Sequence, residues 1–423
     1  MRLAFKLTLL GLLALSPMLS ARAEPINLPA LLKNGSIRVE TESGEALLRH
    51  RDDELFVPAS IIKVATAFCA LQELNANYRF STEFLLDDKN ILFVRASGDP
   101  TMISEELFAI AQAIAKKTGR VNEIIIDTSL FSSTLTIDGA SSSLNPYDAK
   151  NSAFVGNFSS AYLTRTKTGA VTSAEPQTPL TPLSRKAGLK LKRGTTARIK
   201  IGEDWKTGAL YGGELLSEFL TQAGLKTARR ITLGPISSSA RTLLIHTSSQ
   251  NLTGIITGML KHSTNFTANQ LFLTLGVKRF GAPATLKKAQ QALTECLSSR
   301  VGWSHFHIEE GSGLSRRNQV SAHLMTILLK KFEPYSDLLP EEDAFRAKTG
   351  SLNGVNSLAG YFELPKFGRL RFAIIINSNV PHLYKYKVAS AVRNYLNLQP
   401  KEAKTALLER LGGVKKSYNR DVL

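Results

Sequence analysis

The sequence predicts an α/β fold of the α+β kind: an antiparallel sheet built from both chain ends packs on helices, with a mainly β region inserted between them. Alternating residues at 36–41 and 45–50 predict two strands near the start of the chain. Apolar runs at 355–364 and 370–376 predict two more near its end. Between these ends, residues 132–182 change to a Ser, Thr, Asn, Gly and Pro composition that indicates short strands and loops.

Helices are expected in the middle and at the end of the chain. From Ser60 onward about a dozen residues are apolar on nearly every side, which predicts a helix buried in a large domain. Further helical patterns lie at 104–117, 213–223, 252–262 and 383–396, and a strand is expected at 121–127. The resulting division is a signal peptide (1–23), the first part of the main domain (24–97), the inserted region (98–240), the second part of the main domain (241–400) and a basic tail (401–423).

The first residues resemble an export signal. Arg2 and Lys6 precede a short apolar stretch at 7–15, and Ala21-Arg22-Ala23 is a small-x-small cleavage pattern. We therefore expect a mature chain that starts near Glu24, is secreted across the inner membrane into the periplasm, and is soluble or at most peripheral to the membrane. The alternative is that the stretch remains as an uncleaved anchor.

The chain of 423 residues carries a formal net charge of +18, or +15 once Arg2, Lys6 and Arg22 are removed. A basic exported protein meets polyanions such as cell-wall polymers and lipid head groups. Nucleic acid is the weaker alternative, because the export signal argues against it. A third interpretation is that the lysines only solvate the surface. Oligomeric state has no signal in the sequence.

The two cysteines and the histidines indicate no metal or cofactor site. Cys69 lies in an apolar helical run and nothing in the sequence pairs it with Cys296, so two buried thiols are expected, although export permits a disulfide. His305 and His307 suit one face of a strand but have no further ligands around them, so both are interpreted as structural.

Ser60 and Lys63 form the first candidate for chemistry. Residues three apart share a helix face, so the two side chains can touch. A lysine in apolar surroundings loses its proton more easily and can then deprotonate a serine. The alternative is a serine N-cap beside a lysine that reaches water.

Two later motifs complete a set. Ser263-Thr264-Asn265 follows the helical run at 252–262, and Lys348-Thr349-Gly350 leads into Ser351 and the strand at 355–364. The order S-x-x-K, S-x-N, K-T-G is that of penicillin-binding proteins and serine β-lactamases. Lys167-Thr168-Gly169 breaks this order and is interpreted as a chance match.

With these residues, the chain resembles the class C low-molecular-mass penicillin-binding proteins, the D-alanyl-D-alanine carboxypeptidases and endopeptidases of peptidase family S13. The resemblance covers most of the chain and includes Pro58-Ala59, SGDPT from Ser97, PYDA from Pro146, GSGLSR from Gly311 and GVNSLAGY from Gly354. It implies a β-lactamase/transpeptidase-like domain with insertions between Ser60 and Ser263, and an enzyme that cleaves peptidoglycan stem peptides through an acyl-enzyme and binds β-lactams without a cofactor.

The resemblance also implies roles for single residues. The catalytic group would be Ser60 as nucleophile, Lys63 as its base, Ser263 as proton relay, Asn265 as a holder of Lys63 and substrate, and Lys348 as a source of positive potential. Thr349, Gly350 and Ser351 would bind substrate, the two hydroxyls taking the terminal carboxylate. The backbone N–H groups of Ser60 and Ser351 would form the oxyanion hole. Asp148 matches the family pattern only loosely, and there it would contact the amino group of a peptide side chain.

The chain departs from the family pattern at four positions. Thr264 and Asn269 stand where acidic residues are common, Ser351 replaces a usual Thr, and Glu310 replaces a usual Asp. No catalytic atom is lost, but Thr264 and Asn269 put the rate in question. Two alternatives to the peptidase remain: a non-catalytic wall-binding homologue, and a serine β-lactamase, for which no Glu-x-x-Leu-Asn phrase lies between Ser263 and Lys348.

Overall fold

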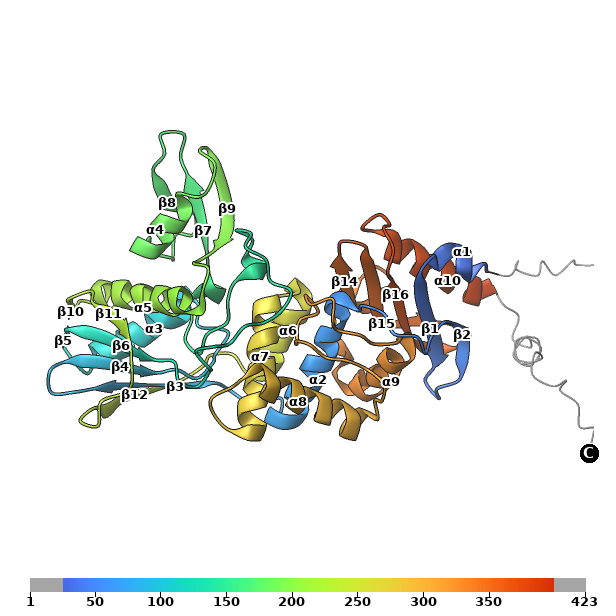
Figure 1. Ribbon diagram of the computed structural model, residues 1–423, viewed down its shortest axis with the longest axis horizontal. Coiled ribbons are helices and arrows are strands. Elements are labelled where there is room, and N and C mark those ends of the chain that lie inside the picture. Colours follow the sequence, from blue (N-terminus) through green and yellow to red (C-terminus); the bar gives the residue numbers. More distant parts are fainter. Residues whose placement is uncertain (1–25, 399–423) are drawn as a thin grey trace, which may run out of the picture.

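The two ends of the described chain meet in one six-stranded antiparallel sheet, as the sequence predicts. The computed structural model describes residues 26–398; the predicted signal peptide and basic tail lie outside them. In Figure 1 the early strands lie beside the late ones. The sheet order is β13-β14-β15-β16-β1-β2, with β1 (Gly35–Thr41), β2 (Ala46–His50), β13 (Glu341–Glu342), β14 (Phe345–Leu352), β15 (Val355–Leu364) and β16 (Gly368–Ile376).

The apolar alternation explains why this sheet forms. Ile37 of β1 is paired with Ile374 of β16, and Val39 with Phe372. Ile374 faces one hydrophobic cluster, whereas its neighbour Ile375 faces the other, so both sides of the sheet are buried. Helices α1 (Leu28–Leu32) and α10 (Tyr384–Leu398) cover the first side, and α2 (Lys63–Leu74) and α9 (Ala322–Phe332) cover the second.

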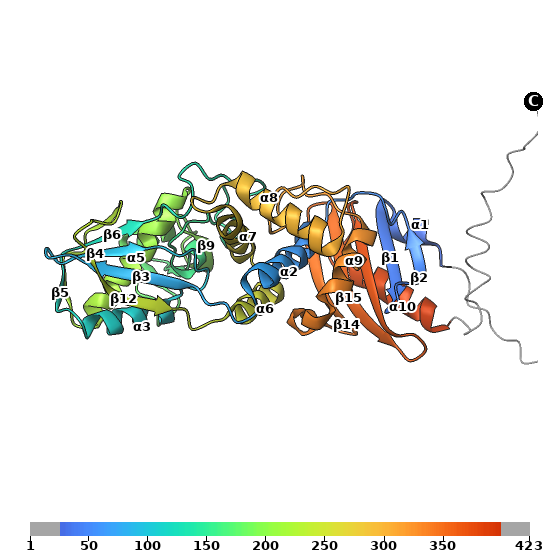
Figure 2. The same ribbon diagram turned by 90° about the horizontal axis from the view of Figure 1, so that it is seen from below.

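A second sheet lies at the other end of the molecule, with the helical body between the two (Figure 2). Its order is β11-β6-β4-β3-β12, and α3 (Ser104–Ala115) and α5 (Trp205–Gln222) pack on it. The strands are β3 (Ser81–Leu86), β4 (Ile91–Arg95), β6 (Glu123–Asp127), β11 (Ile231–Leu233) and β12 (Arg241–Thr247); β5 (Arg120–Val121) pairs with β10 (Lys226–Thr227) alongside. This sheet takes in strands on both sides of the predicted insertion, and the exact division into domains stays a prediction.

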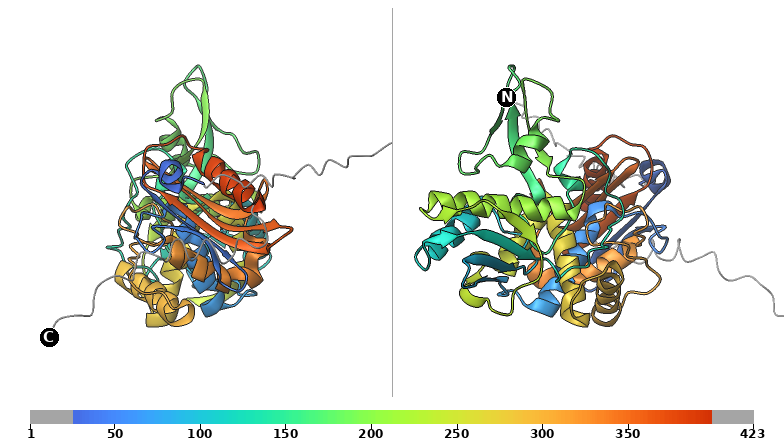
Figure 3. Two further views of the ribbon diagram at one scale, coloured as in Figure 1. Left: turned by 90° about the vertical axis from the view of Figure 1, so that its right-hand side faces the viewer. Right: turned by 60° about the vertical axis from the view of Figure 1, so that its left-hand side comes forward.

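A third, smaller unit stands away from the rest of the molecule (Figure 3). It consists of β7 (Ser160–Arg165), β8 (Val171–Ser173), β9 (Thr195–Lys200) and α4 (Pro182–Gly188). The inserted region thus holds three helices beside its short strands. Among residues 26–398, no helix is long and apolar enough to cross a membrane.

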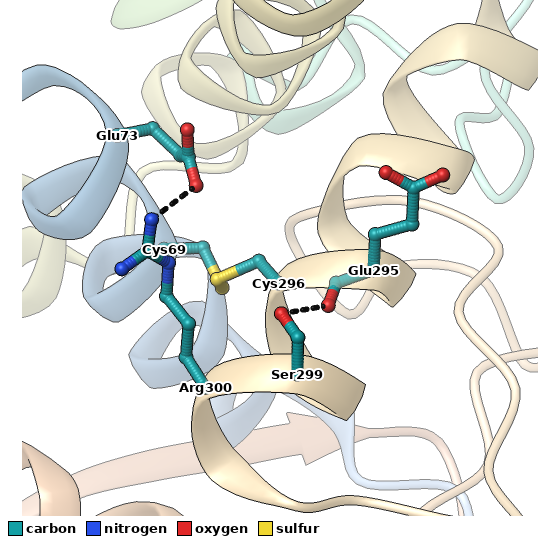
Figure 4. Close-up of a disulfide and its surroundings, with 6 residues drawn as sticks. All are labelled: Cys69, Glu73, Glu295, Cys296, Ser299 and Arg300. Carbon is teal, nitrogen blue, oxygen red and sulfur yellow. Dashed lines mark hydrogen bonds and ion pairs between the residues drawn. A yellow bond between two sulfur atoms is a disulfide. The ribbon is translucent and has the colours of Figure 1, made fainter.

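The helical body carries the disulfide that the sequence did not predict. It comprises α2, α6 (Leu252–His262), α7 (Asn265–Phe280) and α8 (Leu286–Cys296). The prediction of two buried thiols was wrong: Cys69 of α2 is bonded to Cys296 of α8, with their Cα atoms 6.0 Å apart (Figure 4). The 227 residues between them explain the error, because neither helical periodicity nor spacing reports on helix-to-helix packing over that distance. Beside the bond, Arg300 forms an ion pair with Glu73 at 3.3 Å.

Candidate active site

Ser60 lies at the junction of a tight turn and the buried helix α2. It is half-buried within a single 3-10 turn, Ala59–Ile62, that runs directly into α2. Ala59 has φ of +51°, a left-handed conformation that is unfavourable for alanine. Gly313 packs against this turn so closely that a Cβ at that position would lie 2.0 Å from the Ala59 carbonyl oxygen. The surrounding chain therefore holds the segment before Ser60 in a defined, strained geometry.

Lys63 is fully buried and makes three hydrogen bonds. Its Nζ lies 2.7 Å from Ser60 Oγ, 2.8 Å from Asn265 Oδ1 and 2.6 Å from the Ser312 carbonyl oxygen. A charged lysine donates to all three, whereas a neutral amine has two N–H donors and one lone pair. Asn265 Oδ1 and Ser312 O can only accept, so the lone pair of a neutral Lys63 must face the Ser60 hydroxyl. The contacts alone assign the neutral amine as acceptor of the Ser60 proton.

The surroundings of Lys63 favour its neutral form. Burial and the positive charge of Lys348 lower the pKa of Lys63 well below its ordinary value, against an opposing effect from Glu310. No carboxylate within residues 26–398 lies at ion-pair distance from its Nζ. A base is therefore available at lower pH than for a lysine in water.

The second motif reaches Lys63 through a helix-to-helix turn. Helix α6 ends at His262, and Ser263 caps it in the left-handed conformation, with its N–H donating to the Met259 carbonyl. Helix α7 then begins at Asn265, whose Oδ1 accepts from Lys63. The half-buried Ser263 hydroxyl has no hydrogen bond to another described residue, and Thr264 makes no side-chain cap for α7.

The loop after Ile308 holds the third partner of Lys63, and sequence reasoning missed its role. Glu310 is fully buried and accepts hydrogen bonds from Ser312 N, Gly313 N, Ser315 N, Asn318 Nδ2 and Asn269 Nδ2. These bonds fix the loop so that the Ser312 carbonyl meets Lys63. The GSGLSR phrase marked this loop in the sequence, but a backbone carbonyl leaves no signal of its own.

Asn269 fits its place beside Glu310. Its Nδ2 donates to Glu310 Oε2 at 2.9 Å, and its Oδ1 accepts from Gly311 N at 2.9 Å. An acidic residue at 269 would place a second negative charge against the buried Glu310 carboxylate. The amide removes that repulsion and keeps the loop in place, so this departure is compatible with an intact site.

The third motif lies on β14, against the turn that carries Ser60. A Cβ on Gly350 would lie 2.2 Å from Ser357 Oγ and 3.0 Å from Ser60 N, so only glycine fits there. Ser357 Oγ also donates to the Pro58 carbonyl at 2.6 Å, which joins β15 to the same turn. The structure thereby brings Gly350 and its neighbours Thr349 and Ser351 beside Ser60.

Lys348 is a buried cation in the described chain without a carboxylate at ion-pair distance. It is 1% exposed, and its Nζ donates to the Thr349 carbonyl at 2.8 Å. Burial lowers the pKa of Lys348 to about 8, with Glu342 opposing and Lys385 adding to the shift. A buried, unpaired ammonium favours the binding of an anion.

The structure buries Asp148, which the loose match pairs with an amino group of the peptide, within its own loop. The carboxylate is 1% exposed and accepts from Ser141 N at 2.8 Å, Ser141 Oγ at 2.7 Å and Ser143 Oγ at 2.5 Å. Burial raises its pKa, but these hydrogen bonds outweigh burial and lower it overall. Asp148 therefore holds its own loop together.

A cavity of about 380 Å³ adjoins the site. Its wall includes Asn265, Phe266 and Leu314 from the site and Asp138, Tyr147 and Trp205 from the inserted region. Together with the contacts above, the arrangement can carry out acyl transfer: a serine with a buried amine base, an unpaired cation and room for a substrate beside them.

Comparison with known proteins agrees with this chemistry. The chain is 26% identical to a D-alanyl-D-alanine carboxypeptidase of Actinomadura sp., over 82% of this chain and 78% of that protein. It is 23% identical to the D-alanyl-D-alanine carboxypeptidase DacB of Haemophilus influenzae, over 81% of this chain and 85% of that protein.

Solved structures share the fold. Penicillin binding protein 4 (dacB) from Haemophilus influenzae superimposes with a TM-score of 0.72 at 19% identity, covering 88% of this chain and 100% of that one. A predatory peptidoglycan endopeptidase from Bdellovibrio bacteriovorus gives a TM-score of 0.53 at 15% identity, covering 92% and 96%. The family model described as D-Ala-D-Ala carboxypeptidase 3 (S13) matches residues 23–340 and 336–395. The chain therefore belongs to the D-Ala-D-Ala carboxypeptidase 3 (S13) family, a family of peptidases.

Proposed function

We propose that the protein is a penicillin-binding serine peptidase that removes the terminal D-alanine from peptidoglycan stem peptides through an acyl-enzyme on Ser60. The observation that carries this proposal is the set of contacts around Lys63. Among the described residues that contact a neutral Lys63 amine, the Ser60 hydroxyl is the one that can give it a proton. Family membership supplies the substrate class.

The proposed reaction has two halves. Ser60 gives its proton to Lys63 Nζ while Oγ attacks the carbonyl carbon between the two D-alanines, and the N–H groups of Ser60 and Ser351 stabilise the oxyanion. As the C–N bond breaks, Ser263 passes its proton to the leaving amine and takes one from protonated Lys63, which becomes neutral again. Water then cleaves the ester and regenerates Ser60.

Substrate recognition uses the remaining motif residues. Asn265 holds Lys63 and the substrate amide, and Lys348 supplies positive potential. Thr349 and Ser351 donate to the terminal carboxylate, and Gly350 leaves room for the peptide beside Ser60. The cavity next to Asn265 holds the rest of the stem peptide.

The test uses labelling and product release together. Fluorescent penicillin is expected to label wild type and not Ser60→Ala, and wild type is expected to release D-alanine from a pentapeptide. Equal labelling of both proteins contradicts the nucleophile assignment. Folded protein that releases no D-alanine favours the non-catalytic wall-binding alternative, and rapid nitrocefin turnover favours a β-lactamase.

The same site can also cleave D-Ala–diaminopimelate cross-links. The Bdellovibrio structure with this fold is named a peptidoglycan endopeptidase, which motivates this second activity. Digestion of cross-linked muropeptides, followed by mass spectrometry, separates the loss of one alanine from the splitting of dimers.

We also propose that the protein acts in the periplasm after export. The charged start, apolar stretch and Ala21-Arg22-Ala23 pattern support this location. The bond between Cys69 and Cys296 supports it independently, because disulfides persist in oxidising compartments. Fractionation of cells that express the tagged protein tests it, with N-terminal sequencing to find a start near Glu24.

A further inference from the structure

A buried lysine outside all three motifs, Lys385, contacts the third motif where the substrate carboxylate is expected to bind. Lys385 lies on α10 and is 1% exposed. Its Nζ lies 2.6 Å from Ser351 Oγ and 3.3 Å from the Gly350 carbonyl oxygen. Within residues 26–398, no carboxylate lies at ion-pair distance from this ammonium. The nearby Glu342 carboxylate accepts from Tyr386 Oη instead.

The charged form of Lys385 fixes the direction of the bond to Ser351. A charged lysine has three donors and no acceptor, so Ser351 Oγ accepts and its own hydrogen must point elsewhere. In the described part of the chain, the Ser351 hydroxyl has no other hydrogen bond. Lys385 therefore leaves Ser351 with an unused donor on the edge of β14.

Two buried positive charges lie close to the oriented Ser351 hydroxyl. Lys348 and Lys385 are both buried, and neither has an ion-pair partner among the described residues. Lys348 Nζ contacts the Thr349 carbonyl and Lys385 Nζ contacts Ser351 Oγ, so both ammonium groups touch the same short stretch of β14. A buried ammonium is unfavourable unless an anion approaches it. A C-terminal carboxylate bound by the two hydroxyls would be that anion.

We propose that Lys385 is a positioning residue that aims the Ser351 hydroxyl at the C-terminal carboxylate of the substrate and adds to the positive potential that selects it. The proposal rests on the proposed function and deepens it by naming what makes the site prefer a free carboxylate. The competing explanation is that Lys385 only anchors α10 to the Gly350 carbonyl. An anchor would affect every ligand of the site equally.

The test compares two forms of one acylating agent. Penicillin and its methyl ester share the reacting ring, but only the acid carries the carboxylate. For Lys385→Met, the second-order rate constant of acylation is expected to fall about 10- to 100-fold with the acid, and less than about 3-fold with the ester. Lys387→Met is the matched control, because Lys387 is exposed on the same helix and is expected to react like wild type with both agents.

Two further measurements distinguish orientation from folding. In a Ser351→Ala background, Lys385→Met is expected to lower the acylation rate constant less than it does in the wild type. Both changes remove the same hydrogen bond from Ser351 to the carboxylate. With the D-Ala-D-Ala peptide, Lys385→Met is expected to raise KM more than it lowers kcat. Should Lys385→Met not fold, Lys385→Gln keeps a neutral N–H donor and is expected to lose part of the preference for the acid.

Several results would overturn the inference. One is that Lys385→Met lowers the acylation rate constant equally for the acid and the ester. Another is that it lowers neither rate constant, and a third is that its effect adds fully to that of Ser351→Ala. Failure of the wild type to be acylated by either agent would instead contradict the proposed function, so the two failures are distinguishable.

Discussion

The triplet Lys-Thr-Gly occurs four times in the chain, at 117–119, 167–169, 206–208 and 348–350, and two of these copies show how little the letters alone decide. Lys348-Thr349-Gly350 lies within β14, where Gly350 packs against Ser60 N and Lys348 is buried. Lys167-Thr168-Gly169 forms the turn between β7 and β8 in the projecting unit, where Lys167 is exposed and Gly169 has φ of +98°. In the first copy glycine is needed for lack of space, and in the second for backbone conformation.

The comparison shows what turns a short motif into a site. A lysine next to a threonine has no special property until burial removes water from its ammonium and a nucleophile lies beside it. Both conditions come from residues far away in the sequence: the turn at Ser60 and the strand β15. Two experiments contrast the copies and a third tests the buried lysines of the site, from the largest expected effect to the smallest.

The lysines should differ most. Lys348→Met removes the buried cation from the site and is expected to lower the rate constant of acylation by penicillin about 1,000-fold, the scale of losing a preorganised electrostatic group. Lys167→Met is expected to leave that rate unchanged, because its side chain lies in solvent on another unit. Stopped-flow acylation measures both. If folded Lys348→Met protein loses less than tenfold in the acylation rate constant, the buried charge of Lys348 does not drive acylation.

The glycines should differ in kind. Gly350→Ala introduces a methyl group at 2.2 Å from Ser357 Oγ and 3.0 Å from Ser60 N, which must displace β14 or the nucleophile turn. Acylation is expected to fall about 100-fold, as for a reacting group misplaced by about 1 Å. Gly169→Ala at positive φ is expected to cost about 1 kcal/mol in the free energy of unfolding and nothing in acylation. Urea unfolding and acylation kinetics on both variants separate the two effects, and equal acylation rates would contradict the difference.

The pH dependence should be bell-shaped. Lys63 must be neutral to accept the Ser60 proton, so the rate rises as pH passes its lowered pKa. Lys348 and Lys385 must both stay protonated to attract the carboxylate, and burial lowers the pKa of each to about 8, so the rate falls above that pH by about tenfold or more per pH unit. The acylation rate constant between pH 5 and 10 provides the measurement, with the penicillin methyl ester as a control that should lack most of the decline. A rate with the acid that still rises at pH 10 would exclude this assignment.

The strands and the Ser60–Lys63 pair could be predicted because their signals are local. Alternation at 36–41 and apolar runs at 355–364 and 370–376 identify a half-buried or buried pleated surface within each segment. The pairing of Lys63 with Asn265, 202 residues away, came from the family pattern and not from spacing. Lys63 and Asn265 belong to short motifs whose residue types can be recognised in the sequence.

Other parts of the site leave no comparable signal. The Ser312 carbonyl belongs to the backbone, so any residue supplies it. Lys385 lies on a helix whose lysines alternate between buried and exposed positions, and the sequence alone does not say which one faces β14. The bond between Cys69 and Cys296 depends on how α2 and α8 pack, which neither helix encodes by itself.

The meeting of the two chain ends in one sheet has a consequence for biosynthesis. Strand β1 emerges from the ribosome more than 300 residues before β16, its hydrogen-bonded neighbour. Until β14 has been synthesised, the Ser60 turn has neither the β14 backbone nor Lys348 beside it. A chain that stops before β14 is therefore expected to be inert towards cell-wall peptides, and hydrolytic capacity arises only after the late strands have joined the early ones.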